Sequence, residues 1–114
     1  MKGIGYLIGI DSFDCYKNQV TEIPAEIGKL TKLISLDLCK AYILETIPPE
    51  IGKLKKLKLI RLCLTQVKVI PNEIGNLENL EYLDISCNRL RNIPAEIGNL
   101  KSLKTLHIES NVLK

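Results

Sequence analysis

Hydrophobic and polar positions alternate along this chain in two kinds of segment that follow one another. In stretches such as LEYLDISCNRL (80–90) aliphatic residues take alternate positions, whereas in stretches such as IPAEIGNL (93–100) they lie three residues apart. Alternate side chains of a strand point to opposite faces, and a three-residue spacing places side chains on one face of a short helical turn. The pattern predicts five strands, near residues 10–18, 33–41, 57–65, 80–88 and 103–111.

The helical segments are near copies of one another. The stretches IPAEIGKL, IPPEIGKL, IPNEIGNL and IPAEIGNL follow in steps of 24, 23 and 23 residues, beginning at Ile23, Ile47, Ile70 and Ile93. A step this regular predicts a solenoid, in which each repeat packs on its neighbours and the strands form a parallel sheet at about 4.8 Å per strand. We expect one domain over residues 1–114, in which residues 1–9 form a partial N-terminal repeat and terminal caps are missing.

Each helical segment carries a proline, a pair of aliphatic residues and a glycine in fixed places. Proline is tolerated in the first turn of a helix, because its missing N–H leaves nothing unpaired there. Ile97 and Leu100, and their equivalents, are expected to face inward. Gly98 and its equivalents are expected where a side chain would crowd the turn or where φ is positive.

The strand segments resemble the leucine-rich repeat family. Residues 80–90 read L-x-x-L-x-L-x-x-N-x-L, the consensus of that family, and the IPxEIGxLxxL form is similar to its 23-residue subclass. The resemblance covers the whole chain. It implies an α/β solenoid with a parallel sheet on the concave face and short helical or 3-10 turns on the convex face.

In this family the asparagine of the consensus turns inward and hydrogen-bonds backbone groups of its own loop and of the next repeat. Here that ladder would consist of Asn18, a gap at Ala41, and then Thr65, Asn88 and Asn111. The gap falls in the single 24-residue repeat, whose extra residue we place between Lys40 and Leu44 with a local bulge. In that repeat Ile43 is assigned to the last inward position, and Ala41 or Tyr42 to the asparagine slot.

The outward strand positions can be arranged in three rows across the sheet. The rows read Ser12, Ser35, Leu59, Tyr82, Thr105; then Asp14, Asp37, Arg61, Asp84, His107; then Tyr16, Cys39, Cys63, Ser86, Glu109. The convex segments repeat with little variety, whereas these rows vary, and tyrosine and arginine are enriched in interface hot spots. The predicted binding residues are therefore Asp14, Tyr16, Asp37, Leu59, Arg61, Tyr82, Asp84, His107 and Glu109. Solvated strand residues without a binding role remain the alternative.

The middle row raises two chemical possibilities. Asp37, Arg61 and Asp84 are expected to form an Asp–Arg–Asp ladder of exposed ion pairs, each worth about 0–1 kcal/mol. His107 is expected beside Asp84, but no serine or cysteine nucleophile lies in line with the pair, so we assign no catalytic residue.

Four cysteines lie at positions 15, 39, 63 and 87. They lack CxxC spacing, so a zinc site has no support and we assign no metal-binding residue. Cys15 takes an inward leucine position, and Cys39 and Cys63 share an outward row on neighbouring strands. Their expected Cα separation of about 5 Å would permit a disulfide, but parallel in-register geometry is unfavourable, and we expect four free thiols.

Composition narrows the function further. The net charge is only +3 and aromatic residues make up 4%, which disfavours nucleic-acid binding. No apolar run approaches the about 20 residues of a membrane span, and the opening MKGIGYLIGI lacks a cleavage site and fits a repeat better than a signal peptide. The absence of an N-x-S/T sequon is consistent with a reducing compartment, and we expect a cytoplasmic protein without a cofactor.

The sequence thus predicts a non-enzymatic module that binds a protein or peptide through its concave face. A structural spacer, or a fragment of a larger protein whose activity lies in flanking domains, is the alternative. If the terminal repeats are uncapped, Leu106, Ile108 and Leu113 at one end, and Ile4, Leu7 and Ile10 at the other, would lie against water. End-to-end association of copies is an expected consequence.

Overall fold

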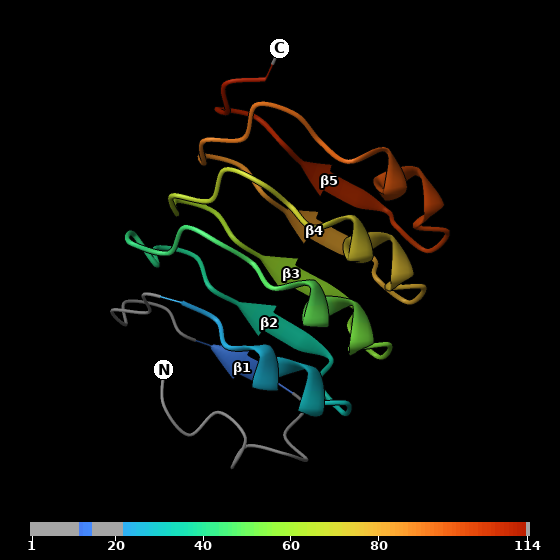
Figure 1. Cartoon of the computed structure of the whole chain (residues 1–114). Coiled ribbons are helices and arrows are strands. Elements are labelled where there is room, and N and C mark those ends of the chain that lie inside the picture. Colours follow the sequence, from blue (N-terminus) through green and yellow to red (C-terminus); the bar gives the residue numbers. More distant parts are fainter. Residues whose placement is uncertain (1–11, 15–21, 114) are drawn as a thin grey trace.

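A computed structural model of the chain describes residues 12–14 and 22–113, with the side chains described only from residue 22 onward. Five three-residue strands form one parallel sheet in chain order: β1 (Ser12–Asp14), β2 (Ser35–Asp37), β3 (Leu59–Arg61), β4 (Tyr82–Asp84) and β5 (Thr105–His107). A 3-10 turn precedes each strand after β1: η2 (Ala25–Lys29), η3 (Pro49–Lys53), η4 (Asn72–Asn76) and η5 (Ala95–Asn99). The strands stack one above the next (Figure 1).

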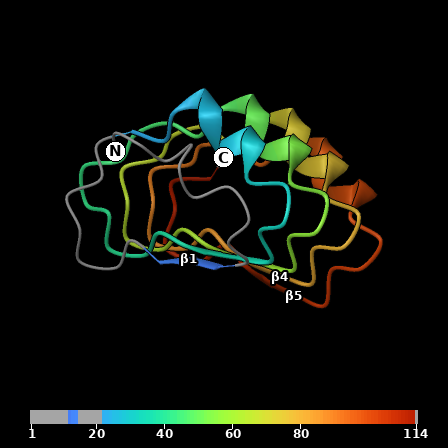
Figure 2. The same ribbon diagram turned by 90° about the horizontal axis from the view of Figure 1, so that it is seen from below.

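The sheet and the 3-10 turns occupy opposite sides of the coil. Figure 2 shows the strands along one side and the turns along the other, with the chain passing between them in every repeat. The α/β solenoid predicted from the sequence is confirmed. The convex turns are 3-10 helices, one of the two forms that the sequence left open.

The Ile-Pro step explains how each turn begins. Pro24, the residue before η2, has an extended backbone at φ −74° and ψ 161°, and its carbonyl accepts a 3.0 Å hydrogen bond from the Ile27 N–H. Pro48, Pro71 and Pro94 do the same in their repeats. The repeated proline therefore stands one residue before each turn, where its fixed φ suits the extended approach. Of the four described turns, η3 alone also begins with a proline, Pro49, in the first-turn position that the sequence suggested.

The core is a stack of aliphatic side chains between the sheet and the turns. Ile27 in η2 and Leu30 directly after it are 1% and 0% exposed, and Leu36 and Leu38 from the β2 repeat are 1% and 0% exposed. Equivalent residues repeat in the next two coils, so most of this interior is isoleucine and leucine. Each such side chain contributes about 1.5–3 kcal/mol when fully buried.

The glycines of the turns allow neighbouring coils to approach closely. A Cβ added at Gly75 would lie 2.7 Å from the Glu96 carbonyl oxygen, and one at Gly52 would lie 2.8 Å from the Glu73 carbonyl oxygen. At Gly98 a Cβ would meet nothing within 4 Å. Crowding by the next repeat, one of the two reasons that the sequence suggested, therefore explains Gly52 and Gly75, and none of these glycines has a positive φ.

The expected polar ladder forms in the C-terminal half of the described chain. The Asn88 amide donates to the carbonyls of Leu62, Ile85 and Ser86 at 3.0, 2.9 and 3.1 Å, and its Oδ1 accepts from the Thr65 N–H at 2.9 Å and from the Thr65 hydroxyl. Asn111 repeats the pattern toward Ile85 and Ile108. Asn18 lies outside the described residues.

The long repeat differs from the prediction at one position. Ala41 fills the asparagine slot and is fully buried, and Leu44, not Ile43, takes the last inward position at 0% exposure. Tyr42 and Ile43 are 58% and 50% exposed. The extra residue is therefore accommodated by a two-residue excursion at Tyr42 and Ile43, within the interval that the sequence indicated.

Candidate functional site

The strand pairing aligns the middle outward row along the sheet. Asp14 pairs with Asp37, Asp37 with Arg61, Arg61 with Asp84, and Asp84 with His107. The first row aligns in the same way, so Leu59 pairs with Tyr82. Tyr16 lies outside the described residues, as does the side chain of Asp14.

An ion pair joins the second and third strands on this face. Arg61 Nη1 lies 3.0 Å from Asp37 Oδ2, and the two side chains are 41% and 20% exposed. Asp37 Oδ1 accepts a 3.0 Å hydrogen bond from the Cys39 N–H. The pair therefore links two repeats, and its partial exposure limits its contribution to about 0–1 kcal/mol.

Asp84 departs from the expected Asp–Arg–Asp ladder and from the expected solvent-facing row. It is 8% exposed, and its Oδ1 accepts hydrogen bonds from the Ser86 N–H at 3.0 Å and the Ser86 hydroxyl at 2.6 Å. Among the described residues it forms no ion pair with Arg61, which binds Asp37 instead. The carboxylate folds back on its own loop because the Ser86 donors lie within reach two residues later.

His107 sits in a small polar and aromatic group at the C-terminal end of the sheet. Its Nδ1 lies 3.3 Å from Glu109 Oε1, and its ring meets the Tyr82 ring edge-on at a centroid distance of 5.6 Å. The two ion-pair side chains are 41% and 62% exposed. His107 is thus paired with Glu109 and not with Asp84, and its side chain remains partly exposed.

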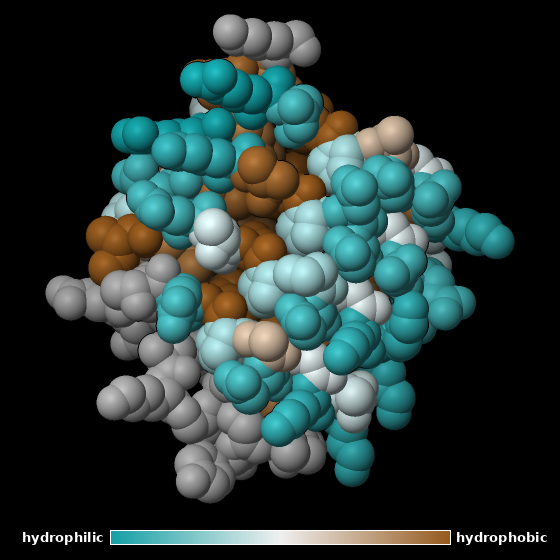
Figure 3. All heavy atoms as spheres, in the orientation of Figure 1, coloured by the Kyte–Doolittle hydropathy of each residue, from teal (hydrophilic) through white to brown (hydrophobic). Residues whose placement is uncertain are grey.

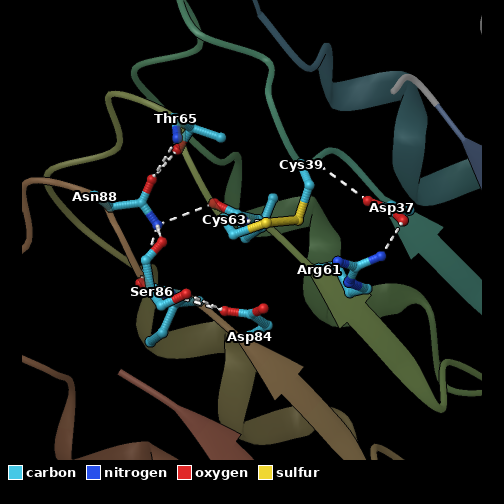
Figure 4. Close-up of a disulfide and its surroundings, with 10 residues drawn as sticks. Asp37, Cys39, Arg61, Cys63, Thr65, Asp84, Ser86 and Asn88 are labelled. Atoms are coloured by element: carbon cyan, nitrogen blue, oxygen red, sulfur yellow. Dashed lines mark hydrogen bonds and ion pairs between the residues drawn. A yellow bond between two sulfur atoms is a disulfide. The ribbon is translucent and has the colours of Figure 1, made fainter. Parts of the chain in front are cut away.

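The third row corrects the prediction about the cysteines. Cys39 and Cys63 form a disulfide with a Cα separation of 4.5 Å, so the expectation of four free thiols is wrong for these two (Figure 4). Cys87 is free, and Cys15 lies outside the described residues. The parallel geometry is no obstacle because β2 ends at Asp37, so Cys39 already lies in a turn when it meets Cys63.

The same turn makes the third row less exposed than the sequence suggested. Cys39 is 1% exposed and Ser86 is 6% exposed, whereas Cys63 is half-buried and Glu109 is exposed. A group that the sequence missed results: the sulfurs of Cys39 and Cys63 and a carboxylate oxygen of Asp84 all lie within 4.8 Å of one another. The signal was present in the rows, where Cys39, Cys63 and Ser86 are neighbours and Asp84 precedes Ser86 by two residues.

A second surface was not anticipated from the sequence. A hollow on the flank, where the chain leaves the strands toward the turns, is lined by Lys68, Val69, Arg89, Arg91, Asn92 and Val112. Its three cationic side chains form no ion pair within the described part of the chain. This positively charged hollow is a second candidate binding surface beside the concave face.

The convex side is a poorer candidate for selective binding. Figure 3 looks onto the face that carries the 3-10 turns, and hydrophilic side chains cover those turns. The turns repeat nearly the same residues, with an acidic residue in the first turn of each. None of the helices in the described residues is both long enough and apolar enough to cross a membrane.

Comparisons with solved structures return coils of the same kind. A plant ice-binding protein shares 39% identity over 81% of this chain and 31% of its own, with a TM-score of 0.74. The BIR3–SERK2 complex from Arabidopsis thaliana shares 30% identity over 82% of this chain and 51% of that chain, with a TM-score of 0.74.

A third structure is the leucine-rich repeat ectodomain of the Arabidopsis thaliana receptor kinase GASSHO1/SCHENGEN3 in complex with Casparian strip integrity factor 2. It shares 27% identity over 96% of this chain and 16% of that chain, with a TM-score of 0.70. The present chain thus spans about half or less of these structures. A search among curated proteins finds no significant match.

A family model described as a leucine-rich repeat region matches residues 1–110. The match, the consensus in each repeat and the parallel coil of the structure agree with one another. The chain therefore belongs to the leucine-rich repeat family.

Proposed function

We propose that the chain is a protein-protein interaction module that binds its partner through the concave sheet. The observation that carries the proposal is the alignment of chemically different, partly exposed side chains on neighbouring strands. Leu59 and Arg61 on β3 lie beside Tyr82 on β4, and His107 on β5 contacts Tyr82. Arginine and tyrosine, which lie together in this patch, are residue types enriched at interface hot spots.

The solved structures of similar coils are consistent with this use. Two of the three are complexes: one joins BIR3 and SERK2, and the other joins a receptor ectodomain and Casparian strip integrity factor 2. These particular partners are specific to the proteins in those complexes. The complexes nevertheless support a protein or peptide as the class of ligand for the present chain.

The plant ice-binding protein indicates that similar coils can have a different function. An ice lattice repeats at a fixed interval, so a surface that matches it must repeat the same chemistry in every coil. The concave row of this chain changes from Asp37 to Arg61 to Asp84 to His107. For the concave face, that variation favours a partner that is itself irregular, such as a protein.

We further propose that the module is not an enzyme, needs no cofactor for binding its partner and works in the cytoplasm, where the Cys39–Cys63 disulfide would be kept reduced. The described concave face offers His107 paired with Glu109 rather than with a nucleophile. The nearest alternative is a spacer whose recognition lies in flanking domains.

Quantitative capture of proteins from a cell lysate distinguishes the proposed interaction module from the alternative, a spacer. The baits are the wild type, Arg61→Glu and Tyr82→Ala on the concave face, Lys53→Glu on the convex turn η3, and Arg89→Glu on the flank. We expect proteins that are retained by the wild type, Lys53→Glu and Arg89→Glu, but lost from both concave variants. Equal retention by all baits supports the spacer, and loss with Arg89→Glu alone moves the site to the flank.

A second copy of the chain is a further proposed partner. Leu106 in β5 is 38% exposed, Leu113 beyond that strand is 41% exposed, and Ile108 is partly buried. An open strand edge invites pairing. Sedimentation equilibrium of the full chain at rising concentration should show dimers that Leu106→Lys abolishes, and a strict monomer at the highest concentration would refute the idea.

A further inference from the structure

We propose that, once their disulfide is reduced, Cys39 and Cys63 bind a thiophilic divalent cation such as Zn²⁺ together with the carboxylate of Asp84. The two cysteines lie in neighbouring repeats and Asp84 in the next one, so the site would join three successive coils (Figure 4). The three ligands are far apart in the chain and lack metal-binding spacing, and only the alignment of the repeats brings them together.

The geometry brings three suitable ligand atoms together. The two sulfurs and a carboxylate oxygen of Asp84 lie within 4.8 Å of one another. Tetrahedral zinc holds thiolate at about 2.3 Å and carboxylate oxygen at about 2.0–2.2 Å, so its ligands lie about 3–4 Å apart. Once the disulfide is reduced, the two sulfurs are no longer bonded and can move to the ligand separation of about 3–4 Å.

The surroundings favour negatively charged ligands. The Cys63 N–H lies 3.1 Å from the Cys39 sulfur and would donate to a thiolate there. Asp84 is more than nine-tenths buried, and Ser86 occupies its Oδ1 with two hydrogen bonds, which fixes the carboxylate and leaves its Oδ2 for another contact. Burial and fixed orientation of a ligand are features that raise metal affinity.

The nearby arginine does not block the site. Arg61 lies between Asp37 and Asp84 in the pairing register, and a cation would be repelled by a free guanidinium. Arg61 is held 3.0 Å from Asp37 Oδ2. Its charge is thereby directed to the other carboxylate and partly offset.

Each step of loading balances in atoms and electrons. A trialkylphosphine attacks the disulfide, and water then releases two thiols and the phosphine oxide, so the phosphorus is oxidised and the sulfurs are reduced. Zn²⁺ next replaces the two thiol protons, which pass to the buffer, and forms two zinc–sulfur bonds and one zinc–oxygen bond. The fourth position is left to water, since Cys63 is only half-buried and solvent can reach it.

Cobalt titration tests the site, because Co²⁺ bound to thiolate absorbs through sulfur-to-metal charge transfer. The working protein is the full chain carrying Cys15→Ser and Cys87→Ser, which retains only the two proposed thiols. After reduction by the phosphine and its removal without oxygen, we expect one Co²⁺ per chain, displaced by Zn²⁺, with two protons released on Zn²⁺ binding. The oxidised protein should show no charge-transfer band.

Matched variants assign the ligands. In the same background, Cys63→Ser should abolish the charge-transfer band, and Asp84→Asn should weaken Co²⁺ binding at least about tenfold while the fold persists by circular dichroism. Ser35→Asn, on the same face but outside the group, should leave the affinity unchanged. Absence of the band in the reduced working protein would overturn the proposal, and so would equal affinity in the Asp84→Asn variant.

Discussion

In each of the turns that follow β2, β3, β4 and β5, one residue has a left-handed backbone conformation. Lys40, Leu64, Cys87 and Ser110 have φ values of 68°, 57°, 56° and 60°, and each stands directly before the asparagine slot of its repeat. None is glycine, although a side chain in this region costs about 1–2 kcal/mol. In the repeats of Cys87 and Ser110, the hydrogen bonds that the inward-facing Asn88 and Asn111 make offset this cost.

The first prediction uses this strain at Ser110, which is exposed. Ser110→Gly should raise the free energy of unfolding by about 0.5–1 kcal/mol, because glycine adopts a positive φ without penalty but loses more entropy on folding. Urea denaturation measures the change. Ser110→Ala keeps the Cβ and removes only the hydroxyl, so it should not stabilise, and a gain equal to that of glycine would refute the role of strain.

The second prediction concerns Asn88, which is 8% exposed and makes hydrogen bonds through both ends of its amide. Asn88→Ala should lower the free energy of unfolding by about 2–4 kcal/mol, since it leaves buried backbone groups unpaired. Asn88→Asp should cost at least as much, because it replaces a donor with an acceptor that faces three carbonyls. Asn92→Ala, at an exposed site on the flank, is the control and should change stability by less than about 0.5 kcal/mol.

At the scale of the element, the 3-10 turns stack closely enough to require glycine. Gly75→Ala should destabilise the chain by about 1–3 kcal/mol, because its Cβ would meet the Glu96 backbone at 2.7 Å. Gly98→Ala is the matched control in the next turn, where nothing lies within 4 Å. Thermal unfolding should therefore separate the two variants, and an equal loss at both positions would contradict close stacking as the cause.

The disulfide ties neighbouring elements together across 24 residues of chain. Closing a loop of this size is expected to stabilise the fold by about 3 kcal/mol. In oxidising buffer, Cys63→Ser should lose that amount in urea denaturation, whereas Cys87→Ser should behave as the wild type. In reducing buffer the wild type and Cys63→Ser should have nearly the same free energy of unfolding. A difference that persists there would assign the loss of stability to packing and not to the disulfide.

At the scale of the whole molecule, periodicity was sufficient to predict the solenoid, the parallel register and the alignment of Asp37, Arg61 and His107. It could not predict what happens after each strand ends. The expected exposure of Cys39 and Asp84 assumed that strand geometry continues, but the chain turns sharply through Lys40 and its equivalents. A positive φ at lysine, leucine, cysteine and serine has no local signal. The sequence could therefore place Cys39 beside Cys63, but it could not show that the turn lets them bond or that Asp84 is buried.

The central claim is that the concave sheet binds the partner, and paired affinities test it most directly. Using a protein captured by the wild type, isothermal titration calorimetry would compare Arg61→Glu on β3 with Lys53→Glu on η3, two reversals of charge on opposite sides of one coil. We predict a Kd raised at least about tenfold by Arg61→Glu and changed less than about twofold by Lys53→Glu. An unchanged Kd for Arg61→Glu with weakened binding by Lys53→Glu would contradict it.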